Sequence, residues 1–150
     1  MPLKVIVGSE TKDVEAVRVY PATTAKRVTR IEAWNGSAWK LVQSFAPPIS
    51  LSVSPQSSDA SVNSASVAAV VTSNVTATVV GGTAPYTYAW VQTSGPAASI
   101  YSPTSATTKF AMGLGPGSSE DAQFTCTVTD SNGQTAAAIA FATFSNTSGA

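Results

Sequence analysis

The chain has 150 residues, which suits one domain of ordinary size or a domain of about 100 residues with a small appendage. Charged residues make up only 11% of it, and eight basic residues balance eight acidic ones, which argues against a general polyanion-binding protein. With no histidine and one cysteine, it lacks the usual general base and metal ligand and cannot form an internal disulfide.

Short apolar alternations predict that the first 47 residues form a small β unit. Strand-like runs occupy residues 3–7, 14–20, 27–34 and 39–45. Asn35-Gly36 lies between the last two runs and is a strong hairpin signal, which places Trp34 opposite Trp39. A unit of this size has a marginal core, so we expect it to need a neighbour to complete itself.

Pro47 and Pro48 mark the expected boundary between two domains. Neither proline donates a ladder hydrogen bond and both keep the chain extended, so the pair forms a stiff connector. The charge balance changes at the same point: residues 1–47 have seven basic and four acidic side chains, whereas residues 48–150 have one and four. We therefore expect an N-terminal β anchor domain over residues 1–47 and a separate domain over residues 48–150.

After the prolines, eight more strands are predicted, with turn signals at the spacing of a β-sandwich. They cover residues 49–53, 67–72, 74–80, 85–92, 98–101, 106–112, 122–129 and 134–144. The last strand is apolar on both faces, with Ala137, Ile139 and Phe141 on one face and alanines ending at Phe144 on the other. We expect its outer face to be covered by something that the chain does not supply.

Two positions in these strands predict an immunoglobulin-like sandwich. Trp90 ends an alternation of aromatic and small residues, and Cys126 lies in a second alternation that includes Phe124. We expect all three side chains to be structural core residues. Ala77 stands where such domains have their other cysteine, so stability must come from packing alone. The predicted fold class is all-β: a C-terminal Ig-like β-sandwich preceded by a small β-hairpin or meander.

Three groups with chemical potential each have a structural explanation. A buried Cys126 acts as a small hydrophobic residue and not as a reactive thiol. Residues 130–133 begin like a calcium loop, but they lack its glutamate and lie between strands, which favours a tight turn with positive φ at Asn132 and Gly133. Glu120 and Asp121 are interpreted as solvated residues at the start of a strand, in preference to a cation site or an acid and base pair. The sequence therefore predicts no metal and no cofactor.

No serine or threonine has a visible activating base, because the chain has no histidine and no lysine cluster suited to that role. Gly81-Gly82 precedes a strand and not a helix, so it resembles a turn and not a phosphate-binding loop. We therefore predict that the protein is not an enzyme.

Basic and aromatic residues gather in the N-terminal part. They are Arg27, Arg30, Trp34, Trp39 and Lys40. Arginine and aromatic side chains contribute most of the binding energy at protein interfaces, so these residues are the candidate docking surface. The two tryptophans have an equally good alternative explanation, which is that they pack in the core of the small β unit. Nucleic acid is not an expected partner, because the basic residues are few and no helix is available to enter a groove.

Four stretches of the C-terminal part resemble the bacterial and phage Ig-like or PKD-like modules. They are residues 81–90 (GGTAPYTYAW), 94–96 (SGP), 102–110 (SPTSATTKF) and 126–133 (CTVTDSNG). Residues 28–40 (VTRIEAWNGSAWK) are similar to short β segments near the start of tailed-phage tail proteins.

Together the two resemblances imply a structural virion component of a tailed bacteriophage, with a minor tail protein as the first expectation and a capsid decoration or head-fibre protein as the alternative. Its N-terminal part would dock on other virion proteins, in several copies, and its Ig-like domain would contact host surface glycans, with Tyr101 as a candidate contact. The opening apolar run is too short for a secretory signal and no run is long enough to cross a bilayer, which fits synthesis in the host cytoplasm and no membrane insertion. An alternative function from another class of protein is that of a bacterial carbohydrate-binding or adhesin module.

Overall fold

The computed structural model describes residues 3–7, 10–14, 16–21, 28–34, 39–44 and 47–148, with side chains for Glu32 and residues 47–148. The chain forms two compact units, Met1–Pro47 and Pro48–Ala150, so the division falls at the two prolines. Every described element is a β-strand, and the fold class is all-β. The described residues include no helix of the length and hydrophobicity needed to cross a membrane.

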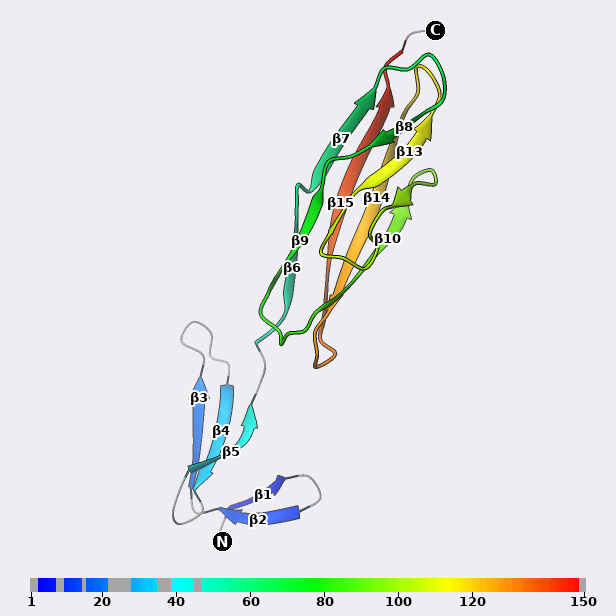
Figure 1. Cartoon of the computed structure of the whole chain (residues 1–150). Helices are drawn as coiled ribbons and strands as arrows, with labels where there is room; N and C mark the ends of the chain where they lie inside the picture. Colours follow the sequence, from blue (N-terminus) through cyan, green and yellow to red (C-terminus); the bar gives the residue numbers. More distant parts are fainter. Residues whose placement is uncertain are drawn as a thin grey trace. The chain divides into compact units, whose positions relative to one another are not determined.

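The N-terminal unit contains a hairpin and a three-stranded antiparallel sheet (Figure 1). Strands β1 (Leu3–Val7) and β2 (Glu10–Val14) form the hairpin. The sheet has the order β3 (Ala16–Pro21), β4 (Val28–Trp34), β5 (Trp39–Ser44). Strand β2 was not predicted as a separate element, because its sequence, Glu-Thr-Lys-Asp-Val, has no apolar alternation.

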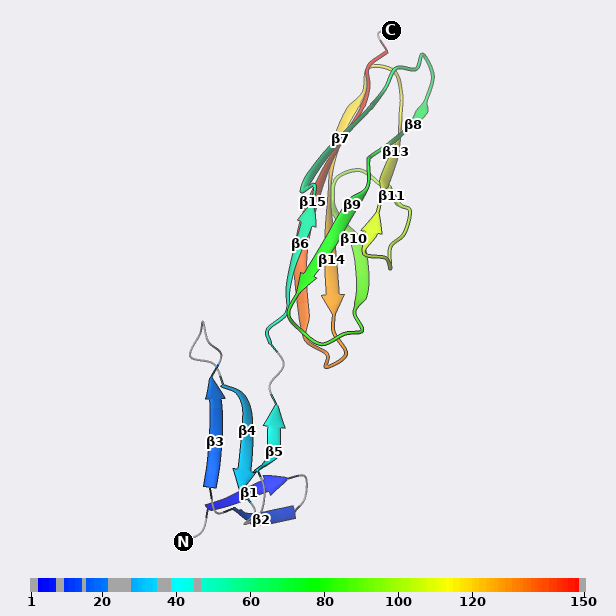
Figure 2. The ribbon, with the colours of Figure 1, turned by 60° about the vertical axis from the view of Figure 1, so that its left-hand side comes forward.

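The C-terminal unit is an Ig-like sandwich of two β layers (Figures 1 and 2). Its first layer is one four-stranded sheet in the order β10 (Thr87–Ser94), β14 (Ser119–Thr129), β15 (Thr135–Asn146), β7 (Ser57–Val62). Strands β14 and β15 form a long antiparallel hairpin, whereas β7 runs parallel to β15. One face of this layer covers the core, and the other is open to solvent in the described chain.

The second layer is divided into two three-stranded pieces. One has the order β12 (Thr107–Thr108), β9 (Val75–Val80), β6 (Ser50–Ser54), and the other β11 (Ser99–Ile100), β13 (Phe110–Leu114), β8 (Ala68–Val71). The strand predicted over residues 106–112 is thus two strands, separated at Lys109. Thr72, directly after β8, extends the pairing of β8 with β13: its backbone N–H donates to the Phe110 carbonyl at 2.9 Å, and its hydroxyl accepts from the Phe110 N–H at 3.0 Å.

Strand β7 is an element that the sequence did not predict. The chain leaves β6 in the second layer, passes Pro55, and enters the first layer as β7 beside β15. The sequence Ser-Ser-Asp-Ala-Ser-Val lacks the alternation of large apolar residues that marks a strand. It forms one here because β15, more than eighty positions later, supplies its hydrogen-bonding partner.

An aromatic cluster fills the centre of the sandwich. The Phe110 and Phe124 rings are parallel within 3°, with centroids 3.7 Å apart, and Trp90 meets Phe110 edge-on at 5.7 Å. Trp90 is 3% exposed and its indole N–H donates to the Ser105 carbonyl at 2.9 Å, while Phe124 and Cys126 are fully buried. The sequence placed Trp90, Phe124 and Cys126 inside but did not single out Phe110, which contacts two of the other rings.

Replacing Trp90 by alanine is expected to lower the free energy of unfolding by about 3–5 kcal/mol, because a large buried ring is lost and a cavity remains. The matched control is Tyr101→Ala, where the side chain is 61% exposed and the expected change is within about 0.5 kcal/mol. Urea unfolding of both full-length variants, followed by far-UV circular dichroism, measures the difference. A loss below about 1 kcal/mol for Trp90→Ala would contradict the central role of this ring.

Candidate functional site

The residues predicted to dock on a larger particle belong to the N-terminal unit. Arg27 lies outside the described residues. Arg30 and Trp34 are in β4, and Trp39 and Lys40 are in β5. The register places Trp34 opposite Trp39 at one end of this strand pair, with Lys40 next to it, whereas Arg30 lies opposite the far end of β5. The backbone thus brings three of these residues together and separates Arg30 from them.

Tyr101, the predicted glycan contact, directly follows β11 at the edge of the second layer. It is well exposed and borders a hollow of about 390 Å³ on that layer's outer face. The other lining residues are Ala69, Ser99, Ala111, Met112 and Gly113. Among the lining side chains, only those of Tyr101 and Ser99 carry a hydroxyl, so this hollow offers apolar contact and few hydrogen-bonding groups.

The outer face of the four-stranded layer carries a second group of exposed apolar side chains. Val91, Ile139 and Phe141 are 59%, 39% and 45% exposed. Val91 and Ile139 lie in one row across the sheet, with Thr125 between them, and Phe141 lies two residues beyond Ile139 on the same face of β15. The predicted apolar outer face of this strand is therefore present, and no described residue of the C-terminal unit covers it.

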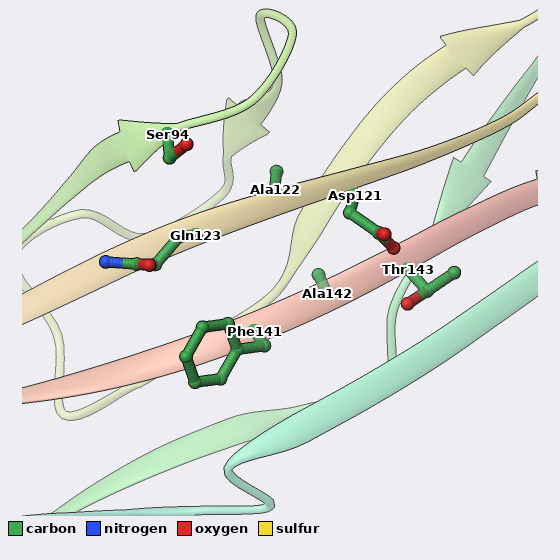
Figure 3. Close-up of a pocket in the computed structure, with 7 residues that line it drawn as sticks. All are labelled: Ser94, Asp121, Ala122, Gln123, Phe141, Ala142 and Thr143. Atoms are coloured by element: carbon green, nitrogen blue, oxygen red, sulfur yellow. The ribbon is translucent and has the colours of Figure 1, made fainter.

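A hollow of about 360 Å³ surrounds Phe141 on this face. Its floor consists of two adjacent cross-strand pairs, Gln123 opposite Phe141 and Asp121 opposite Thr143, and Ser94 lies opposite Gln123 on the third strand. Side chains in such pairs are about 5 Å apart, and the two rows are about 7 Å apart along the strands. Figure 3 shows the Phe141 ring beside the Gln123 amide and the Asp121 carboxylate beside the Thr143 hydroxyl.

Most polar atoms of this hollow have spare hydrogen-bonding capacity. The side-chain amide of Gln123 donates through Nε2 to the Thr93 hydroxyl at 3.2 Å. The side-chain oxygen of Gln123, Oε1, stays available. The side-chain oxygens of Ser94, Asp121 and Thr143 have no hydrogen-bond partner among the described residues. An exposed ring is thus bordered by a carboxylate, an amide oxygen and two hydroxyls that solvent or a ligand must satisfy.

The wall of the hollow at Ser94 is fixed by its own turn. A bulge between Gln92 and Ser94 shifts the register there, and the Gln92 amide nitrogen donates to the carbonyls of Ser94, Gly95 and Pro96 at 3.1, 3.2 and 2.6 Å. Gly95 has a φ of 91° and lies so close to the Asp121 carbonyl that a Cβ would collide with it. The turn therefore packs directly on β14 and holds the wall in one position.

The charge around the hollow is negative. Asp121 is the one charged residue that lines it, and Asp59 lies across Thr143 on β7. Lys109, the single basic residue of the C-terminal unit, lies between β12 and β13 in the other layer. An anionic ligand would therefore meet repulsion here without a compensating cation.

Two ionisable groups elsewhere in the sandwich have structural roles. Burial raises the pKa of the Cys126 thiol from 9.0 to about 11, so the unreactive thiol form dominates at neutral pH. Burial also acts to raise the pKa of Asp130, but hydrogen bonds from the N–H groups of Gln134, Thr83 and Asn132 and from the Gln134 side chain hold it below its usual value. No group of three potential ligands that could hold a metal ion occurs among the described residues.

The turn at residues 130–133 differs in one detail from the prediction. Of Asn132 and Gly133, only Gly133 has a positive φ, of 78°. Asn132 instead donates from its backbone N–H to the Asp130 carboxylate at 2.9 Å and from its amide to the Thr83 hydroxyl at 2.8 Å. The carboxylate therefore organises the turn and ties it to the preceding β9–β10 connection.

Phe141 is the exposed residue that sequence reasoning did not select as a contact. The alternation placed it on one face with Ala137 and Ile139 without deciding which face was the outer one, and the glycan prediction fell on Tyr101 in the other layer. The sequence did not show which side chains lie next to Phe141 across the sheet. Gln123 and Asp121 approach Phe141 and Thr143 only through the β14–β15 register, and Ser94 only through the bulge in β10.

Comparisons with known proteins leave the family of this chain open. No protein-family model matches it, and no curated protein matches it significantly. A solved conjugative transposon lipoprotein from Bacteroides eggerthii is similar, with a TM-score of 0.36 and 14% sequence identity over 63% of this chain and 95% of that chain. A likeness of this strength carries no conclusion about function.

The raised pKa of Cys126 predicts a loss of stability in alkali. A thiol whose pKa is higher in the folded state stabilises the fold fully below pH 9 and loses that contribution as the pH rises to about 11. The free energy of unfolding should therefore fall more steeply between pH 9 and 11 for the natural chain than for Cys126→Ala. Urea unfolding of both proteins across this range tests it, and parallel pH curves would contradict it.

The lowered pKa of Asp130 predicts the opposite pH dependence. The ionised Asp130 contributes fully to the free energy of unfolding above its usual pKa of 3.8. That contribution is lost as the pH falls through the lower pKa of the folded state. Asp130→Asn should be less stable than the natural chain at pH 7, because an amide group cannot accept all four hydrogen bonds, and the difference should shrink below pH 3.8. Asp59→Asn, on the exposed β7 surface, is the matched control and should show little change in thermal midpoint.

Proposed function

We propose that this protein is a structural component of a tailed-bacteriophage virion, a minor tail protein whose N-terminal unit docks on the particle and whose Ig-like unit is displayed for weak adhesion to the host surface. The observation that supports it most is the division of the chain at Pro47 and Pro48 into two separately packed units. The C-terminal unit has a closed hydrophobic core of its own, so it can be carried as an independent module.

The geometry of the sandwich suits attachment by one end. Pro48 approaches Gly81 in the β9–β10 connection, and that connection is bonded through Thr83 to the Asp130 carboxylate of the β14–β15 turn. The connector therefore enters at a reinforced end of the sandwich, and β15 ends at the opposite end (Figure 1).

The proposed mechanism is passive. The strands that carry Trp34, Trp39 and Lys40 would pack on another virion protein, and several copies of the chain on one particle would multiply weak contacts of each displayed module. No catalytic step or cofactor is part of the proposal. The chain would be made in the cytoplasm of the bacterial host and reach its place by assembly into the virion.

A second candidate is a bacterial carbohydrate-binding or adhesin module, which is favoured by the exposed ring and free polar groups of the Phe141 hollow. Both candidates use the C-terminal unit for adhesion. They differ in what the N-terminal unit binds, so association with phage particles separates them.

Deleting residues 1–47 should abolish incorporation into particles while residues 48–150 keep their sandwich. Particles from a lysate of the phage or prophage that encodes the chain are purified on a density gradient, and the protein is quantified by mass spectrometry. Full-length Phe141→Ala is the control and should be incorporated normally, since the substitution lies in the displayed unit. Equal copy numbers for the truncated and full-length chains would refute the docking role, and absence of the full-length chain from particles would leave the adhesin candidate.

A further inference from the structure

We propose that the Phe141 hollow is a binding site for one neutral hexopyranose unit of a surface polysaccharide, an inference that rests on the proposed function because it names the ligand class and the site of the adhesion. The site would consist of the Phe141 ring, the Asp121 carboxylate, the Gln123 amide oxygen and the hydroxyls of Ser94 and Thr143. It lies in the other layer from Tyr101, which the sequence favoured.

A pyranose has two kinds of surface, and this hollow offers a partner to each. Its C–H-bearing face is apolar and packs on an aromatic ring, where it removes apolar area from water. Phe141 is 45% exposed, so its ring is available without any rearrangement of the core. The residues that precede and follow it in the sequence, Ala140 and Ala142, are buried on the other face of β15, which fixes the orientation of the strand.

The hydroxyls around a sugar ring need partners that both donate and accept. Asp121 and the Gln123 carbonyl oxygen can only accept, while Ser94 and Thr143 can do either. Because the row of Gln123 and Phe141 is about 7 Å from the row of Asp121 and Thr143, a sugar stacked on the ring can reach the second row with its outer hydroxyls. The Gln92-anchored turn holds Ser94 in place before any ligand arrives, which reduces the entropy lost on binding.

The charge selects among sugars. The hollow is lined by one carboxylate and no cation, and Asp59 adds a second negative charge nearby. Phosphate-bearing or acidic polysaccharides, nucleic acids and anionic lipid headgroups would therefore be repelled. A neutral hexose or N-acetylhexosamine, whose hydroxyls donate to the carboxylate, is the ligand that matches.

A protein surface matches less well. The hollow has the volume of a small-ligand site, about 360 Å³. Covering the face with an apolar surface would bury the unpartnered oxygens of Ser94, Asp121 and Thr143, and a polar group buried without a partner loses its hydrogen bonds to water and gains none in return. A second copy of this chain would also bring Asp121 and Asp59 close to their own counterparts if the faces met symmetrically.

The test measures binding of the full-length chain to neutral oligosaccharides containing glucose, galactose, mannose or N-acetylglucosamine. Dextran sulfate and heparin serve as anionic probes. Binding is followed on an array with the chain clustered on beads, and then by NMR titration with the positive oligosaccharide. We expect a Kd on the order of millimolar for one site, with little change between low and physiological salt.

Five variants locate the site. Phe141→Ala should weaken binding about tenfold, Phe141→Tyr should retain it because the ring remains, and Asp121→Asn should weaken it several-fold. Ile139→Ala removes an equally exposed apolar side chain one row away, and Tyr101→Ala removes the aromatic residue of the other hollow, so both should bind as the natural chain does. An unchanged urea midpoint in each variant excludes unfolding as the cause.

The possible results separate this inference from the proposed function. Neutral-sugar binding that depends on Phe141 and not on Tyr101 supports the site, whether or not the chain is found in particles. Absence of binding to every neutral probe, binding only to the anionic probes, or dependence on Tyr101 alone overturns it, even if the chain is found in particles. Self-association that Phe141→Ala abolishes, seen by analytical ultracentrifugation, also overturns it and assigns the face to a second copy.

Discussion

The stack of Phe110 on Phe124 is the contact on which the sandwich depends. Phe110 comes from β13 and Phe124 from β14, so the pair joins the two layers directly, and Trp90 closes the cluster edge-on. The chain has one cysteine, and this packing takes the place of the cross-link that Ig domains often have. The break in the second layer comes directly before Phe110, whose N–H and carbonyl are both bonded to Thr72. The ring that joins the layers is thus held directly beside the break in its own layer.

Much of the fold can be predicted because period-two alternation is a local signal. It placed Trp90, Phe124 and Cys126 inside. The division of the chain was predicted from another local signal, the two consecutive prolines, and the boundary between the two compact units falls there. Strand β7 could not be predicted this way. Its sequence is rich in serine, and it becomes a strand through parallel pairing with residues more than eighty positions later. The break at Lys109 could not be predicted for a similar reason, since the backbone hydrogen bonds beside it come from Thr72 and Tyr101, which are distant in sequence or in another strand connection.

The candidate site was partly visible in the sequence. The last strand is apolar on both faces in the sequence, so an apolar outer face was expected without deciding whether it carried Ile139 and Phe141 or the alanines and Phe144. Which polar groups border that surface depends on the β14–β15 register and on the bulge in β10, and neither leaves a local signal. Asp121 was interpreted as a solvated residue at the start of a strand, and it is indeed exposed. Its position beside Thr143 is what gives it a possible binding role.

The distribution of residue sizes on β15 separates folding from function. Its inward positions beside the aromatic cluster are small, with Ala138 opposite Cys126 and Ala140 opposite Phe124, because the rings of the other strands already fill that space. The large apolar residues Ile139 and Phe141 therefore contribute nothing to this core. They lie on the solvent side, where threonine is a polar residue that also favours strands. The position of Phe141, beside polar atoms that lack partners, therefore supports the ligand site that we propose, since the core does not need this side chain.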